Sequence, residues 1–118
     1  MTAQPKQADI RAPELVRTSR SGKVLTIELD NPPAHSLSSA AIAKLHATLD
    51  EARLDRSVNV IVLASSGKIF CAGHDLKEMK AHRANDGDGG RLFLERLFHA
   101  CSAMMKAIVA GERSMEVA

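Results

Sequence analysis

Two kinds of apolar spacing alternate along the chain and predict a mixture of strands and helices. The stretch 23–30, Lys-Val-Leu-Thr-Ile-Glu-Leu-Asp, is short and rich in β-branched residues, which favours a strand. Asn-Pro-Pro at 31–33 ends this strand, because proline cannot donate a hydrogen bond to a sheet. Residues 39–53 have apolar side chains at helical spacing and predict an amphipathic helix. The nearly continuous apolar run at 58–64 is typical of a strand buried on both faces.

The second half of the chain predicts helices. We expect a short helix to begin near Asp75, and residues 91–109 predict a longer one with a wide apolar face. The polar stretch 85–90 between them, Asn-Asp-Gly-Asp-Gly-Gly, predicts a mobile, solvated loop. It also resembles a calcium-binding loop, but the glutamate that closes such a loop is missing from the required position. The solvated loop is therefore the preferred interpretation.

These elements fit one small α/β domain. A strand, a helix and a buried strand in succession favour a crossover connection and parallel pairing. The 118 residues leave no room for a second domain. We divide the chain into a polar, flexible leader at 1–20, a domain at 21–110, and a tail at 111–118 in which the helical period is lost.

Composition and charge exclude several classes of function. Hydrophobic residues at 45% and charged residues at 25% are typical of a soluble globular protein. The net charge of +2 is spread along the chain, and an aromatic content of 3% offers few stacking surfaces, so we expect no nucleic-acid partner. No apolar run approaches the roughly 20 residues that span a bilayer, so we expect no membrane segment.

Cysteine usage and the first residues indicate a cytoplasmic location. Cys71 and Cys101 are too few for a disulfide framework, and no secretory segment precedes them, so we expect buried thiols in a reducing compartment. Arginines in the first 20 residues are typical of a transit peptide, but Asp9 and Glu14 argue against one, since such peptides are poor in acidic residues.

The candidate chemistry lies in residues 68–79, Lys-Ile-Phe-Cys-Ala-Gly-His-Asp-Leu-Lys-Glu-Met. Here a buried strand leads through a glycine-containing turn into a short helix. Backbone N–H groups at such a junction are unpaired and can hold an anion or a developing oxyanion. An ordinary strand–turn–helix explains the same spacing. Cys71 and His74 have the spacing of a metal pair but lack further ligands, so we expect no metal site.

The motif Lys-x-Phe-x-Ala-Gly-x-Asp-Leu-x-Glu-Met resembles the signature of the enoyl-CoA hydratase/isomerase (crotonase) family. The upstream stretch 22–37, with Asp-Asn-Pro-Pro-Ala-His-Ser-Leu at its end, is similar to the first strand and turn of that family. Ala-Gly-His-Asp-Leu-Lys-Glu followed by Phe-x-x-Cys-Ser at 98–102 resembles the enoyl-CoA hydratase domain-containing branch most. The resemblance implies the N-terminal part of a crotonase-type ββα spiral fold, truncated before the fold is complete.

The resemblance also implies a role for particular residues. Family members bind acyl-CoA thioesters and stabilise an enolate-like oxyanion with two backbone N–H groups, the first of which falls on His74 here. Coenzyme A enters as part of the substrate, and no other cofactor is implied. Lys68 and Lys77 are candidates for contacts with its phosphates. The imidazole of His74 replaces a frequent alanine, and we expect it to serve packing before catalysis. The substrate-binding positions implied are these: Ala34, Ser36, Ala72, Gly73, Asp75, Leu76 and Lys77.

The sequence also departs from the family. The second oxyanion donor and the acid/base glutamates of hydratases belong to segments beyond residue 110, and residues 111–118 do not match them. We therefore expect this chain alone to have little or no hydratase or isomerase activity. The alternatives are a non-catalytic member that binds CoA weakly or associates with longer subunits, and a shortened product without a selected function. Family members form trimers and hexamers, so a homo-oligomer is expected.

Overall fold

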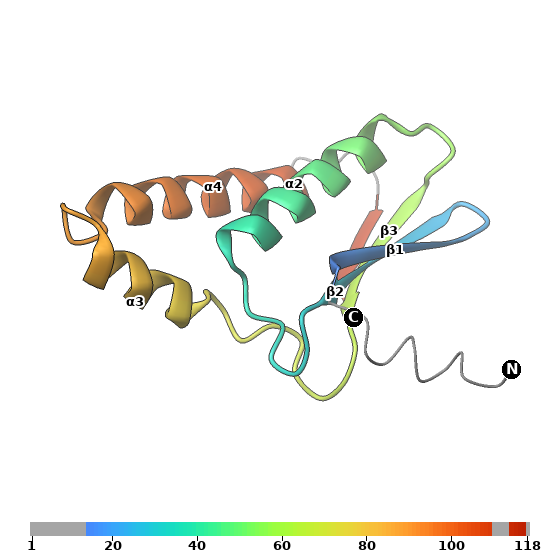
Figure 1. Ribbon diagram of the computed structural model, residues 1–118. Helices are drawn as coiled ribbons and strands as arrows, with labels where there is room; N and C mark the ends of the chain where they lie inside the picture. The colour runs from blue at the N-terminus through green and yellow to red at the C-terminus, as the bar shows by residue number, and fades with distance from the viewer. Residues whose placement is uncertain (1–13, 110–113, 118) are drawn as a thin grey trace, which may run out of the picture.

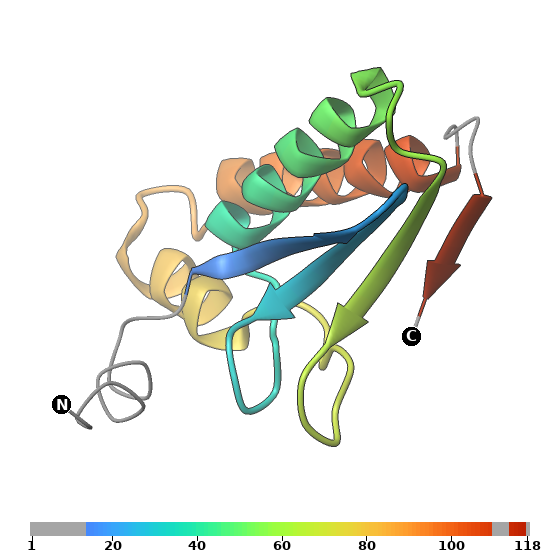
Figure 2. The same ribbon diagram turned by 90° about the vertical axis from the view of Figure 1, so that its right-hand side faces the viewer.

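The computed structural model describes residues 14–109 and 114–117 (Figure 1). Its elements are, in chain order, β1 (Leu15–Ser21), β2 (Val24–Asp30), α2 (Ser39–Leu54), β3 (Val60–Ser65), α3 (Leu76–Asn85), α4 (Arg91–Val109) and β4 (Ser114–Val117). The strands form one sheet in the order β1-β2-β3-β4. Figures 1 and 2 show α2 and α4 on one face of this sheet, and α3 beyond its end. The predicted α/β class is confirmed.

Strand β1 corrects the part of the predicted flexible leader at 1–20 that begins at Leu15. Residues 15–21 pair antiparallel with β2, with Ser21 opposite Val24 across the turn at Gly22. β1 is the edge strand, Val16 is its only buried side chain, and its residues from Arg17 onward are polar and show no apolar period. This is why the strand was missed. Residues 1–13 lie outside the described part of the chain.

The predicted crossover from β2 through α2 to β3 is confirmed. β2 and β3 are parallel, with Leu25 opposite Ile61 and Ile27 opposite Leu63. Ser38 begins α2 as its N-cap, where the hydroxyl oxygen accepts a hydrogen bond from the backbone N–H of Ala41 at 3.1 Å. The helix ends at Leu54, one residue later than predicted. β3 begins two residues later than predicted.

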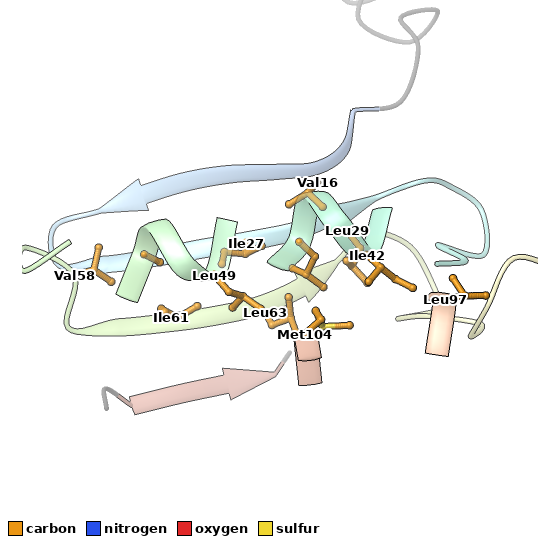
Figure 3. Close-up of a cluster of buried hydrophobic side chains, with 12 residues drawn as sticks. Val16, Ile27, Leu29, Ile42, Leu49, Val58, Ile61, Leu63, Leu97 and Met104 are labelled. Carbon is orange, nitrogen blue, oxygen red and sulfur yellow. The ribbon is translucent and has the colours of Figure 1, made fainter. Parts of the chain in front are cut away.

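The hydrophobic core lies between the sheet and the two helices above it. Figure 3 shows Ile27 of β2, Leu63 of β3 and Leu49 of α2 gathered between these layers. Helix α4 adds Leu97 and Met104 to the same cluster. Because α2 and α4 pack on the same side, the alternate residues of β2 and β3 that face them form the buried set.

Strand β4 lies in the segment that was predicted to be a tail without periodicity. Residues 114–117 pair parallel with β3, from Val60 opposite Ser114 to Leu63 opposite Val117. Four residues are too few to show a strand period, so only the neighbouring strand reveals this element. Residues 110–113 and 118 lie outside the described part.

The glycine-rich stretch at 85–90 is a short turn between α3 and α4. The Asp88 carboxylate accepts hydrogen bonds from the backbone N–H groups of Gly90 and Leu92, at 2.9 and 3.0 Å. Both hydrogen bonds lower the pKa of the Asp88 carboxyl, and the bond from Leu92 has the larger effect. Gly90 has a φ of +85°, and a Cβ there would lie 3.0 Å from the backbone nitrogen of Arg83, so only glycine fits. No group of three metal-ligating side chains occurs among the described residues.

Within residues 14–109 and 114–117, no helix has the length and apolar character needed to cross a membrane.

Adjacent methionines on α4 allow a direct test of this packing. Met104 is 2% exposed in the core, whereas Met105 is 55% exposed. We expect Met104→Ala to lower the free energy of unfolding by about 2–4 kcal/mol, because it removes buried apolar surface and leaves a cavity. Met105→Ala should change it by less than about 0.5 kcal/mol. Thermal and urea unfolding followed by far-ultraviolet circular dichroism measures both. Equal losses in the two variants would contradict the orientation of α4.

Candidate functional site

The turn after β2 is built around a buried histidine. His35 is 1% exposed, and its backbone N–H donates to the Asn31 carbonyl oxygen at 2.8 Å. Its ring Nε2 donates to the Ser66 carbonyl oxygen at 2.8 Å, while Nδ1 accepts from the Asn31 backbone N–H at 3.1 Å. Both ring nitrogens are thus satisfied by the neutral Nε2–H tautomer. His35 therefore anchors the end of β2 to the end of β3. Apart from the presence of a histidine, no pattern in the sequence predicts this role.

The turn after β3 has the glycine that the motif required. Gly73 has a φ of +99°, in the region that L-residues with a Cβ rarely adopt. Just before it, the backbone N–H of Ala72 donates to the Ala34 carbonyl oxygen at 2.9 Å. The two turns predicted from separate motifs are therefore hydrogen-bonded to each other.

An isolated parallel bridge between Leu37 and His74 completes this junction. The Leu37 N–H donates to the Gly73 carbonyl oxygen at 2.7 Å, and the Asp75 N–H donates to the Leu37 carbonyl oxygen at 3.0 Å. In a parallel bridge one residue makes both bonds, and the backbone polar groups of the residue opposite point away from it. His74 is the residue opposite. Its N–H has no hydrogen-bond partner in the described part of the chain.

The first turn of α3 follows directly. Asp75 is the N-cap, and its Oδ1 accepts hydrogen bonds from the N–H groups of Lys77 and Glu78, at 3.0 and 3.3 Å. Asp75 thus serves the helix with its side chain and the bridge with its backbone. Its placement at the helix start, predicted from sequence, is confirmed.

These elements surround a pocket of about 420 Å³. Six of the eight residues named from sequence line it: Ser36, Ala72, His74, Asp75, Leu76 and Lys77. The other two, Ala34 and Gly73, make the hydrogen bonds that join the two turns. Lys68 is not among the lining residues.

Asn31 also lines the pocket and was missed by sequence reasoning. Its side-chain amide donates to the Ser36 carbonyl oxygen at 3.2 Å, which closes the turn under the pocket. The available signal was its place directly before Pro32-Pro33, where asparagine is a common turn residue.

The His74 imidazole packs toward α4. Its ring meets the Phe98 ring edge-on, with centroids 5.6 Å apart and an interplanar angle of 61°. The Nδ1 atom is buried and has no hydrogen-bond partner among the described residues. A buried nitrogen acceptor without a partner costs less than a buried N–H donor without one. We therefore assign the ring proton of His74 to Nε2. The contact with Phe98 supports the packing role expected for this side chain.

A larger hollow of about 590 Å³ lies away from the motif, beside β1, β2 and α2. Its cations are already engaged, because the Lys44 ammonium donates to the Glu14 carbonyl oxygen at 2.7 Å and Arg17 pairs with Asp30 at 2.7 Å. The smaller pocket at the motif, where an amide is unpaired, is therefore the better candidate site.

The cysteines provide no second chemistry. Cys71 and Cys101 are free thiols, and both are half-buried rather than fully buried as expected. The Cys71 sulfur accepts from the Gly73 N–H at 3.4 Å, within the turn. No cluster that would complete a metal site with Cys71 and His74 exists among the described residues.

Comparison with known proteins gives the class of protein to which this pocket belongs. The model of the enoyl-CoA hydratase/isomerase family matches residues 19–112. The chain is 32% identical over 79 residues to a probable enoyl-CoA hydratase of Bacillus subtilis, covering 63% of this chain and 31% of that protein. It is 30% identical over 97 residues to the mitochondrial enoyl-CoA hydratase domain-containing protein 3 of Rattus norvegicus, covering 81% and 30%.

Solved structures agree with this match. An enoyl-CoA hydratase/isomerase family protein from Silicibacter pomeroyi superimposes with a TM-score of 0.78 and 43% identity, over 87% of this chain and 42% of that one. The chain belongs to the enoyl-CoA hydratase/isomerase family, and its fold is the N-terminal part of the crotonase fold. It spans about a third of the length of the two curated relatives. The rat relative is mitochondrial by name, and a cytoplasmic location for this chain stays a prediction.

Replacing His35 tests the anchor beneath the pocket. We expect His35→Ala to lower the free energy of unfolding by about 2–4 kcal/mol, because it leaves a cavity and two backbone groups without partners. His99 is exposed on α4, and His99→Ala is the matched control with an expected change below about 0.5 kcal/mol. Urea unfolding followed by circular dichroism measures the difference. A stable His35→Ala variant would show that the turn holds without the ring.

Proposed function

We propose that this chain binds the thioester end of an acyl-CoA in the pocket between the two joined turns. The observation that carries the proposal is the unpaired N–H of His74, held at a residue that lines the pocket. A thioester carbonyl oxygen accepts one hydrogen bond from such a donor, and the bond strengthens as negative charge develops on that oxygen. The amide therefore polarises the carbonyl and favours enolate-like character in the acyl group. Family membership supports the same assignment.

The other residues of the pocket have supporting roles in this proposal. Lys77 is exposed at the rim and supplies a positive charge for a CoA phosphate. Ser36 and Ala72 lie on the two joined turns, and Leu76 offers apolar surface to the pantetheine chain. These assignments follow the family resemblance and the positions of the residues around the pocket.

The 118-residue chain is proposed to bind without completing a hydration or isomerisation. Among the described residues that line the pocket, Asp75 is the only carboxylate, and its Oδ1 is engaged in capping α3. A site with one oxyanion donor, and with neither a second donor nor a free acid/base group, lacks several kcal/mol of the transition-state stabilisation that a complete site provides. The activity of a complete family site is thus not expected from this chain alone.

Calorimetric titration with acetoacetyl-CoA, with free CoA in parallel, tests the proposal. We expect saturable binding of both, with the acyl-CoA bound more tightly. His74→Pro removes the backbone N–H, and the preceding Gly73 has no Cβ to clash with the proline ring. This variant should lose about tenfold in affinity for acetoacetyl-CoA, the effect of one lost hydrogen bond to a polarised acceptor, and keep its affinity for CoA.

His74→Ala is the matched control, because it removes the ring and retains the N–H. Its preference for acetoacetyl-CoA over CoA should stay within about threefold of the preference of the unchanged protein. This limit separates the two variants, because a threefold change in affinity corresponds to less than half the free energy of about a tenfold change. Equal loss of preference in both variants would assign the effect to the imidazole instead. Absence of binding to the folded, unchanged protein would reject the acyl-CoA proposal for this chain.

A non-catalytic member that associates with other subunits is the second candidate. The observation that favours it is a row of exposed apolar side chains on α4, including Phe98 at 49%, Met105 at 55% and Val109 at 84% exposure. Light scattering with refractive-index detection measures the mass in solution without tryptophan or tyrosine, which the chain lacks. We expect an oligomer that Phe98→Ser with Met105→Ser weakens. A monomer at all concentrations would reject self-association.

A further inference from the structure

Glu78 lies on α3 but makes its hydrogen bonds to the beginning of α2. Its Oε1 accepts from the Ser39 backbone N–H, and its Oε2 accepts from the Ser39 hydroxyl, both at 2.8 Å. Ser39 is the first residue of α2, where backbone N–H groups have no partner within the helix. One carboxylate thus satisfies two donors on an element 39 residues away in sequence.

The contact between Glu78 and Ser39 closes a ring of hydrogen bonds beside His74. Ser39 follows Leu37 by two residues, and the Leu37 carbonyl accepts from the Asp75 N–H. Asp75 in turn caps α3 and accepts from the Glu78 N–H. The ring therefore runs from Leu37 through Asp75 and Glu78 to Ser39 and back along the chain. His74 directly precedes Asp75 of this ring and contributes no backbone hydrogen bond to it.

The negative charge of Glu78 favours its contact with the N-terminus of α2. The first turn of α2 contains no acidic residue, so Glu78 supplies from another helix the negative charge that a helix N-terminus favours. The carboxylate is partly buried there, which strengthens a charge-assisted hydrogen bond over one in open water.

We propose that Glu78 is a positioning residue: by holding α3 on α2 it fixes the direction of the His74 N–H toward the pocket. This inference rests on the proposed function, because the direction of that amide matters only if a carbonyl oxygen binds there. An oxyanion donor works over a narrow range of about 2.7–3.1 Å, so a small rotation of α3 weakens it. The Leu37–His74 bridge is isolated, and the stacking of His82 on Phe93 holds the later part of α3, so Glu78 is the side chain that ties its first turn to α2.

Three variants and a control test the proposal. Glu78→Ala removes both contacts, and Ser39→Ala removes only the hydroxyl contact. Glu78→Gln keeps an oxygen that accepts from the Ser39 N–H, and its amide can donate to the Ser39 hydroxyl. This variant should therefore largely keep the contact between the two helices. Glu95→Ala on α4 is the control, since Glu95 is exposed and pairs only with Arg91 among the described residues.

Two readouts separate positioning from general stability. The first is the ratio of acetoacetyl-CoA affinity to CoA affinity, which a change in the folded fraction alone would leave constant. We expect this ratio to fall about tenfold in Glu78→Ala, in line with a lost hydrogen bond to a polarised acceptor, and less in Ser39→Ala and Glu78→Gln. The second is amide hydrogen exchange, which should accelerate at Asp75 in Glu78→Ala while the core amides of β3 stay protected.

The proposal would be overturned if the affinity ratio of Glu78→Ala lay within about twofold of the ratio of the unchanged protein, because the loss of one hydrogen bond has a larger effect. The proposal would also be overturned if the Asp75 amide exchanged at the same rate in Glu78→Ala as in Glu95→Ala. Failure of the unchanged protein to bind either ligand would instead reject the proposed function. In that case Asp75 exchange alone would decide whether Glu78 holds the two helices together.

Discussion

The site depends on one backbone bridge, in which Leu37 bonds to Gly73 and Asp75 on either side of His74. This bridge brings the turn after β2 against the turn after β3, although the two lie more than 30 residues apart. Parallel pairing of β2 with β3 places both strand ends at the same edge of the sheet, so the turns meet there. His35 and the Ala72–Ala34 bond then hold them in contact.

The bridge also explains why the candidate donor is a backbone group. Because Leu37 makes both bonds, the N–H of His74 is directed away from the sheet pairing and stays unpaired. A donor of this kind does not depend on the identity of the side chain. The sequence can therefore place an imidazole at position 74, packed on Phe98, without removing the amide from the pocket. An unpaired amide in the pocket and variation of the side chain at position 74 are compatible for this reason.

The described fold buries only part of its apolar surface. Helices α2 and α4 cover one face of the sheet, and Figure 2 shows the other face with no described segment over it. Helix α4 divides its apolar residues between a buried side, with Leu97 and Met104, and an exposed side, with Phe98 and Met105. Such a helix is typical of an element with a second neighbour. The chain spans about two fifths of the solved Silicibacter structure, in agreement with this partial burial.

The sequence by itself determined α2, α4 and the buried strand β3 from their apolar period, β2 from its β-branched residues and the start of α3 from Asp75, together with the turns at Pro32-Pro33 and Gly73. Six of the eight candidate site residues that it named line one pocket. Only the tertiary structure decided the rest. β1 and β4 are defined by their neighbouring strands, because a polar edge and four residues show no period. Asn31 in the pocket and Glu78 on Ser39 required distant segments to meet. Their hydrogen bonds join residues whose separation along the chain is set by the fold, so no local pattern records them.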